Sequence, residues 1–117
     1  MIKPWIVYLT GPITGERDAK QKFEKAEKLL RESSPAVYTI NPFSRHPAGL
    51  TNAEYMRLSF AEIDAAHDVA LLPGWEDSDG CNLELAYADY IGKHTFELAK
   101  RFPEAYKEDW EDCNASL

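Results

Sequence analysis

The chain has 117 residues, which suits one domain with a single hydrophobic core, and its hydrophobic fraction of 44% predicts that it folds. Its formal net charge is −7. A polymeric nucleic acid is therefore not expected as a partner, because binding a long phosphate backbone needs a basic stripe. A single phosphate remains compatible with this charge, because backbone N–H groups can hold one without net basicity.

Cysteine content and the N-terminal segment bear on location. Two cysteines are too few for a disulfide framework, so we expect the reducing cytoplasm. The apolar run from Trp5 to Leu9 is too short for a signal peptide or a membrane span, so we expect no membrane partner. The histidines do not cluster and lack metal-ligand spacing, so we expect no metal and interpret each as an ordinary polar residue. They are His46, His67 and His94.

The first part of the chain alternates strands with a helix. Trp5 to Leu9 is a continuous apolar run rich in β-formers, which predicts a buried strand ending in the Gly/Pro loop Thr10 to Gly15. Glu16 to Ser33 carries apolar residues at helical spacing and predicts an amphipathic helix. Val37 to Ile40 predicts a second short strand, ended by Asn41 and the proline after it.

The later part continues the alternation around one central unit. Phe43 to Leu50 is expected to be a loop, and a helix capped by Thr51 or Asn52 should run to about Ala66. Thr95 to Leu98 predicts a short strand, and Phe102 to about Asp112 a terminal helix. Between them, the stretch Asp68 to Gly92 predicts a strand, a loop and a helix. Their expected bounds are Val69 to Leu72, Pro73 to Gly80 and Cys81 to Ile91.

Strands that alternate with amphipathic helices indicate an α/β domain with a parallel sheet of four to five strands and helices on both faces. Ligands bind such sheets outside the carboxyl ends of the strands. The segments expected at that edge are Thr10 to Gly15, Asn41 to His46 and Pro73 to Glu84. We expect one domain over residues 1–117.

Glu84 and Ser78 are the first candidates for chemistry. Glu84 can be a nucleophile or general base beside a bound anion, or only a carboxylate favoured near a helix N-terminus by the dipole. Ser78 and Gly80 can hold a phosphate, or be only a helix cap and a turn glycine. Glu84 follows Ser78 by six residues, on the order of 9 Å in a helix, which matches a ribose 5-phosphate.

Tyr8 and Trp75 have two interpretations each, and Asp68 is not expected to be a catalytic residue. Tyr8 can reach the site from the first strand or belong to the core. Trp75 can stack on a base or pack its own loop. Asp68 starts its strand and should lie at the edge opposite the site, which argues against a catalytic role. The loop after Thr10 is neither a Walker loop nor a dinucleotide fingerprint.

Four motifs together resemble the nucleoside 2-deoxyribosyltransferase-like superfamily, above all its small bacterial and phage members. They are Tyr8-Leu9-Thr10-Gly11-Pro12-Ile13-Thr14-Gly15, Asn41-Pro42, Leu71-Leu72-Pro73-Gly74-Trp75-Glu76 and Ser78-x-Gly80-x-x-x-Glu84. The resemblance implies a flavodoxin-like or Rossmann-like three-layer sandwich, no cofactor, a small nucleotide or nucleoside as partner, and a homo-oligomer whose sites borrow a residue from a neighbouring subunit.

The resemblance also implies roles for residues. Glu84 attacks C1′ of a deoxyribosyl group, and another base or water then takes the glycosyl ester. Tyr8 orients Glu84 or the sugar. Serine at position 78 resembles the deoxynucleoside 5′-monophosphate glycosidases, where it contacts the phosphate, whereas the nucleoside transferases carry aspartate. The expected substrate-binding residues are Gly11, Ile13, Thr14, Asn41, Trp75, Ser78 and Gly80.

Two departures keep other functions open. The resembled enzymes place an aspartate on the helix before the third strand, where this chain has Ser59 and Phe60 and its nearest acids are Glu62 and Asp64. The glycosidases also carry an arginine near the position of Thr14. The first hypothesis is therefore an N-glycosidase or N-deoxyribosyltransferase, and the alternative is a non-catalytic nucleotide-binding module. A flavin carrier is disfavoured, because the first loop has few hydroxyls.

Overall fold

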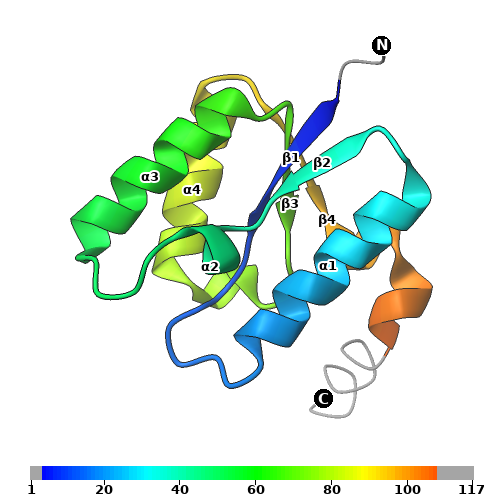
Figure 1. Ribbon diagram of the computed structural model, residues 1–117, viewed down its shortest axis with the longest axis horizontal. Helices are drawn as coiled ribbons and strands as arrows, with labels where there is room; N and C mark the ends of the chain where they lie inside the picture. The colour runs from blue at the N-terminus through cyan, green and yellow to red at the C-terminus, as the bar shows by residue number, and fades with distance from the viewer. Residues whose placement is uncertain (1–3, 108–117) are drawn as a thin grey trace.

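A four-stranded, all-parallel sheet forms the centre of the fold (Figure 1). The computed structural model describes residues 4–107. The strand order is β2-β1-β3-β4. The strands are β1 (Trp5–Thr10), β2 (Val37–Ile40), β3 (Asp68–Leu71) and β4 (His94–Glu97). The predicted α/β fold class, with a parallel sheet and helices on both faces, is confirmed.

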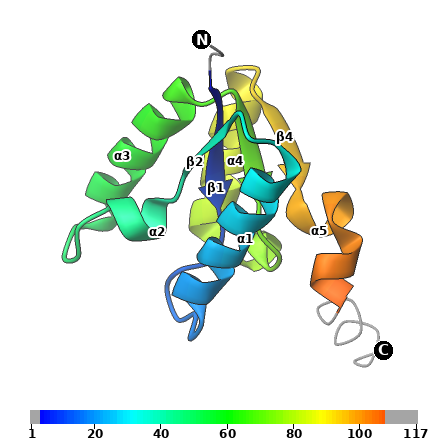
Figure 2. The ribbon, with the colours of Figure 1, turned by 45° about the vertical axis from the view of Figure 1, so that its right-hand side comes forward.

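Helices cover both faces of the sheet, which gives three layers (Figure 1, Figure 2). Helices α3 (Asn52–Ala65) and α4 (Asp79–Tyr90) lie on one side of the strands. Helix α1 (Ala19–Ser33) and the short α5 (Leu98–Arg101) and η2 (Pro103–Tyr106) lie on the other. Each side has its own cluster of buried apolar side chains. No helix within residues 4–107 is long and apolar enough to cross a membrane.

Strand β1 supplies side chains to both layers. Val7 and Leu9 pack in the cluster under α1, whereas Tyr8 belongs to the cluster under α3 and α4. Successive side chains of a strand point to opposite faces, so Thr10 shares the face of Tyr8. Both hydroxyl-bearing side chains therefore point toward α4, close to the carboxyl end of the strand.

Two predicted elements differ from the structure for local reasons. The loop expected over Phe43 to Leu50 is in part a helical turn, α2 (Pro42–Arg45), because Asn41 caps it and proline suits the first helical position. Most of the described part of the helix expected over Phe102 to Asp112 is a 3₁₀ turn, η2 (Pro103–Tyr106), instead of an α-helix. The short helix α5 precedes it and ends at Arg101, because Pro103 lacks the N–H that a continuing helix needs. Residues 108–112 lie outside the described residues.

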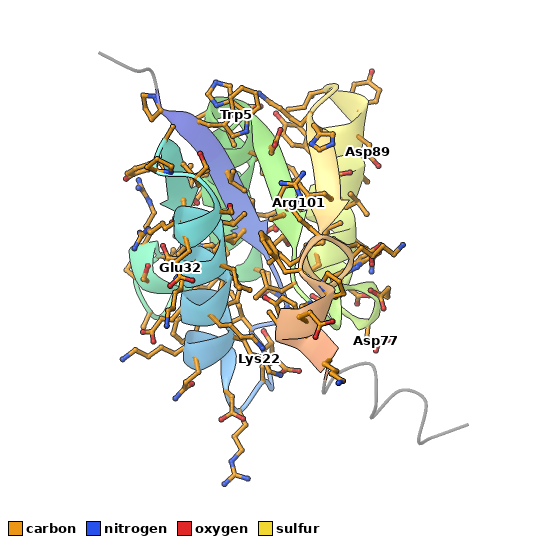
Figure 3. All side chains as sticks on the ribbon, turned by 90° about the vertical axis from the view of Figure 1, so that its right-hand side faces the viewer. Trp5, Lys22, Glu32, Asp77, Asp89 and Arg101 are labelled. Carbon is orange, nitrogen blue, oxygen red and sulfur yellow. The ribbon has the colours of Figure 1, made fainter. Side chains whose placement is uncertain are left out.

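Other differences shift element bounds by a few residues. Helix α4 begins at Asp79, two residues before the expected Cys81, since Ser78 is its cap. The loop after β3 contains a 3₁₀ turn, η1 (Trp75–Asp77). Strand β3 begins at Asp68, so this residue lies at the edge opposite the strand ends, as predicted. Its carboxylate accepts from Trp5 Nε1 at 3.0 Å. Figure 3 shows Trp5 and Asp77 at opposite ends of the molecule.

Candidate active site

The sheet has its switch point between β1 and β3. The chain moves from β1 to β2 on one side and then to β3 on the other, so the loops after β1 and β3 separate and leave a crevice. A pocket of about 910 Å³ opens there, bounded by those loops, by α3 and by the start of α4. A second hollow, of about 350 Å³, is lined by charged side chains of α1 alone. Several elements converge at the pocket between β1 and β3, as is typical of a ligand site, whereas the hollow on α1 involves one helix.

Glu84 is the carboxylate held most firmly in this pocket. It lies on α4, and its residue is only 9% exposed. Thr10 Oγ1 donates to Glu84 Oε2 at 2.6 Å, and the Tyr8 hydroxyl donates to Oε1 at 3.2 Å. Each carboxylate oxygen thus receives one hydrogen bond from β1, which orients the group toward the pocket that it lines.

Burial and polar contacts have opposite effects on the pKa of Glu84. Burial raises the pKa of Glu84, and hydrogen bonds from Thr10, Ser59 and Tyr8, followed by the charge of His46, lower it less than burial raises it. The pKa of Tyr8 is well above its ordinary value, because the hydroxyl is buried and faces Glu84. Tyr8 therefore keeps its proton at neutral pH and remains a donor, and the ionised Glu84 carboxylate is more basic than an exposed one.

The start of α4 forms the second part of the pocket. Ser78 caps the helix, accepting a hydrogen bond from Cys81 N at 3.3 Å. A Cβ placed on Gly80 would lie 3.9 Å from both Met56 Cε and Ser78 Oγ, which also line the pocket, so glycine leaves this end open. Backbone N–H groups at such a helix start can bind an anion.

The charge around the pocket is mostly negative. No Lys or Arg occurs among the lining residues in the part of the chain that the structure describes. The lining residues with a carboxyl or imidazole group are Glu16, His46, Asp77, Asp79 and Glu84. A bound phosphate would therefore depend on Ser78 and backbone N–H groups. Within residues 4–107, no group of three or more His, Cys, Asp or Glu side chains could hold a metal ion.

The loop after β1 lines the pocket along its length. Gly11, Ile13 and Thr14 are all lining residues, as are Ser78, Gly80 and Glu84. Gly11 has an additional packing reason to be glycine, because a Cβ there would meet Leu72 Cβ at 2.8 Å. The two strand ends therefore approach each other more closely than a larger side chain would allow.

Two expected substrate-binding residues do not line the pocket. Asn41 is buried and caps α2, accepting from the N–H groups of Phe43 and Ser44 while its amide donates to Glu27. Trp75 is half-buried, and its Nε1 donates to Glu97 Oε1 at 3.1 Å. Both polar groups are thus engaged within the fold.

Three residues that line the pocket or contact Glu84 were not among the candidates from the sequence. Thr10 was foreseeable, because it shares the strand face of Tyr8. His46 lines the pocket and bonds to Glu62 across sixteen residues of sequence, a pairing that no local pattern indicates. Ser59 is 4% exposed and lines the pocket, and its hydroxyl lowers the pKa of both Tyr8 and Glu84.

Comparisons with known proteins agree with this architecture. The family model described as "Domain of unknown function (DUF4406)" matches residues 5–97, which include the four described strands and all the residues that line the pocket. No curated protein matches the chain. The solved structure of a 2-deoxyribosyltransferase from Leishmania mexicana is similar, with a TM-score of 0.61 and 18% identity, over 86% of this chain and 72% of the other. At that identity the similarity concerns the fold.

Proposed function

Because the chain belongs to the family described as Domain of unknown function (DUF4406), whose description states no activity, we propose a function from the pocket itself. The protein cleaves or transfers the N-glycosidic bond of a deoxyribonucleoside, in the form of its 5′-monophosphate, with Glu84 as the nucleophile. The observation that carries this proposal is the buried Glu84 carboxylate, which receives hydrogen bonds from Thr10 and Tyr8 in a pocket at the sheet's switch point. The deoxyribosyltransferase fold supports it.

The chemistry needs a carboxylate that is oriented and ionised. One oxygen of Glu84 bonds to C1′ as the bond from C1′ to the base breaks, and the base leaves with the electron pair of that bond. Water or a second base then attacks C1′ and releases Glu84. Tyr8 and Thr10 orient the carboxylate from β1, so the nucleophile is positioned before substrate binds.

The start of α4 supports a 5′-phosphate as the second anchor. The Ser78 hydroxyl and the open backbone at Gly80 lie one to two turns before Glu84, on the order of 9 Å and 6 Å along the helix axis. Asp77 and Asp79 lie on either side of Ser78, and they oppose a dianion. The substrate panel must therefore contain each nucleoside beside its monophosphate.

The second candidate is a module that binds a nucleotide without cleaving it. It is favoured by Ser59, which stands near the position where the resembled enzymes carry an acid that protonates the leaving base. A binding module would retain the pocket and the phosphate anchor, and would release no base.

Base release from a panel of deoxynucleosides and their monophosphates distinguishes the two candidates. The wild-type protein should release free base, and Glu84→Gln should not, although it preserves the size of the side chain. Glu76→Gln is the matched control, because Glu76 is exposed in the adjacent turn and does not line the pocket. Binding without base release would refute the enzyme proposal, and base release by Glu84→Gln would refute the role of Glu84 as the nucleophile.

A further inference from the structure

His46 is a nearly buried histidine in the wall of the pocket. It follows α2, which itself follows β2, so it belongs to the edge of the sheet where ligands bind. Its side chain is 8% exposed, and its ring stacks on that of Tyr55 with centroids 5.8 Å apart. Packing of this kind fixes the plane of the imidazole.

Glu62 fixes the ring from behind. Its carboxylate, on α3, is 14% exposed and bonds to His46 Nε2 through Oε1, while Arg45 Nε pairs with Oε2 at 3.0 Å. The carboxylate accepts a hydrogen bond from the Nε2–H group, which leaves Nδ1 as the ring nitrogen available to a ligand. A carboxylate, an imidazole and a pocket in this order form the arrangement by which proteins orient a histidine that moves protons.

The pair is electrostatically connected to the proposed nucleophile. The charge of His46 is among the causes that lower the pKa of Glu84, after burial has raised it. The charge of Glu62 contributes to the raised pKa of Tyr8, after burial and Glu84. Glu84 and His46 also line the same pocket.

We propose that His46 is the proton donor to the departing base, held in position by Glu62. This inference rests on the proposed glycosidic chemistry and supplies the acid that Ser59 cannot. His46 is then a catalytic residue, and Glu62 is a positioning residue that acts through it.

The proton balance closes over the two steps. In the first, which begins with His46 as the imidazolium, Glu84 forms a bond to C1′, the bond from C1′ to the base breaks, and the base nitrogen takes the electron pair and a proton from His46 Nδ1. In the second, neutral His46 takes a proton from water as its oxygen attacks C1′, and Glu84 leaves as a carboxylate. The net reaction consumes one water, and both side chains return to their starting states.

Leaving-group chemistry tests the assignment. His46→Gln preserves a donor toward Glu62 and lacks a group that can protonate a base. It should be compared with the wild type on two substrates: a natural nucleotide that the wild type cleaves, and the same nucleotide with a nitro group on the base. The nitro-substituted base leaves as a stable anion and has little need of an acid.

With the natural base, His46→Gln should lose about 100- to 10,000-fold in kcat/KM, the range for loss of a general acid. With the nitro-substituted base, we expect a loss of less than about tenfold, because only the protonation step is removed. Glu62→Gln should show the same dependence on the leaving group at a smaller magnitude, and Glu62→Asp should recover part of the activity. A merely structural role for Glu62 would lower both rates equally.

His94→Gln is the matched control, because His94 is exposed on β4, outside the pocket lining. Equal losses on both substrates, or a fully active His46→Gln, would overturn the assignment of His46 while the proposed function stands. A wild-type protein that cleaves neither substrate would overturn the proposed function, and this inference with it.

Discussion

Thr10→Val replaces the hydroxyl that lies 2.6 Å from Glu84 Oε2 with a methyl group of the same size. The bond is charge-assisted and Thr10 is 1% exposed, so water does not replace the missing donor. A hydrogen bond to a charged group contributes about 1.5–3 kcal/mol, and one to a neutral group about 0.5–1.5 kcal/mol. Thr10→Val should therefore lower the free energy of unfolding by about 1.5–3 kcal/mol at neutral pH.

The loss should depend on pH in a defined direction. Burial raises the pKa of Glu84 in the folded protein, so the folded state binds this proton more tightly than the unfolded chain. The stability linked to that proton is present in acid and is lost as pH rises through the folded pKa. Because the Thr10 hydrogen bond lowers the pKa of Glu84, its removal raises that pKa further. The cost of Thr10→Val should therefore shrink to about 0.5–1.5 kcal/mol as pH falls below the folded-state pKa of Glu84, where the carboxyl group is protonated.

Urea unfolding at neutral and at acid pH measures both values. Thr95→Val, on β4 and outside the pocket, is the control for replacing a strand hydroxyl with a methyl group. If Thr10→Val lowers the free energy of unfolding equally at both pH values, or no more than Thr95→Val does, then the hydrogen bond from Thr10 to Glu84 does not stabilise the folded protein.

Three further changes have expected outcomes. Glu84→Gln removes a buried charge whose pKa is raised by burial, so thermal unfolding should show a stabilised protein at neutral pH, by about 0.5–2 kcal/mol, and the gain should vanish in acid. Ser78→Ala removes the acceptor for Cys81 N; urea unfolding should show a loss of about 1 kcal/mol, and steady-state kinetics a larger rise in KM for a 5′-monophosphate than for its nucleoside. Gly11→Ala brings a Cβ to 2.8 Å from Leu72 Cβ, and urea unfolding should show a cost of about 1–3 kcal/mol, whereas no change would mean that the two strand ends can separate freely.

Much of the fold follows from local patterns. The apolar run at β1 and the periodicity of α1 and α3 depend on side chains within a few residues of one another, and each element was predicted with bounds close to those observed. The exceptions were also local in origin. Asn41 caps the turn α2, and Pro103 ends α5, and both effects depend on residues next to each other in the sequence.

The candidate site was predictable where chemistry coincides with a strand end or a helix start. Glu84, Ser78, Gly80 and the loop from Gly11 are at the carboxyl edge because the βα order places them there. Trp75 and Asn41 lie at the same edge of the sheet, yet their side chains form hydrogen bonds to Glu97 and Glu27 instead of lining the pocket. Position in an element does not determine which of several partners a side chain meets.

The sequence by itself determined the parallel sheet, the edge at which the pocket opens and the position of the Glu84 carboxylate at that edge. Only the tertiary structure decided that Tyr8 and Thr10 both bond to Glu84, and that Glu62 on α3 fixes His46 in the pocket wall. The physical reason is range. Hydrophobic periodicity and caps act over a few residues, whereas a hydrogen bond between side chains of different elements depends on how α3 and α4 pack against β1, to within less than an ångström.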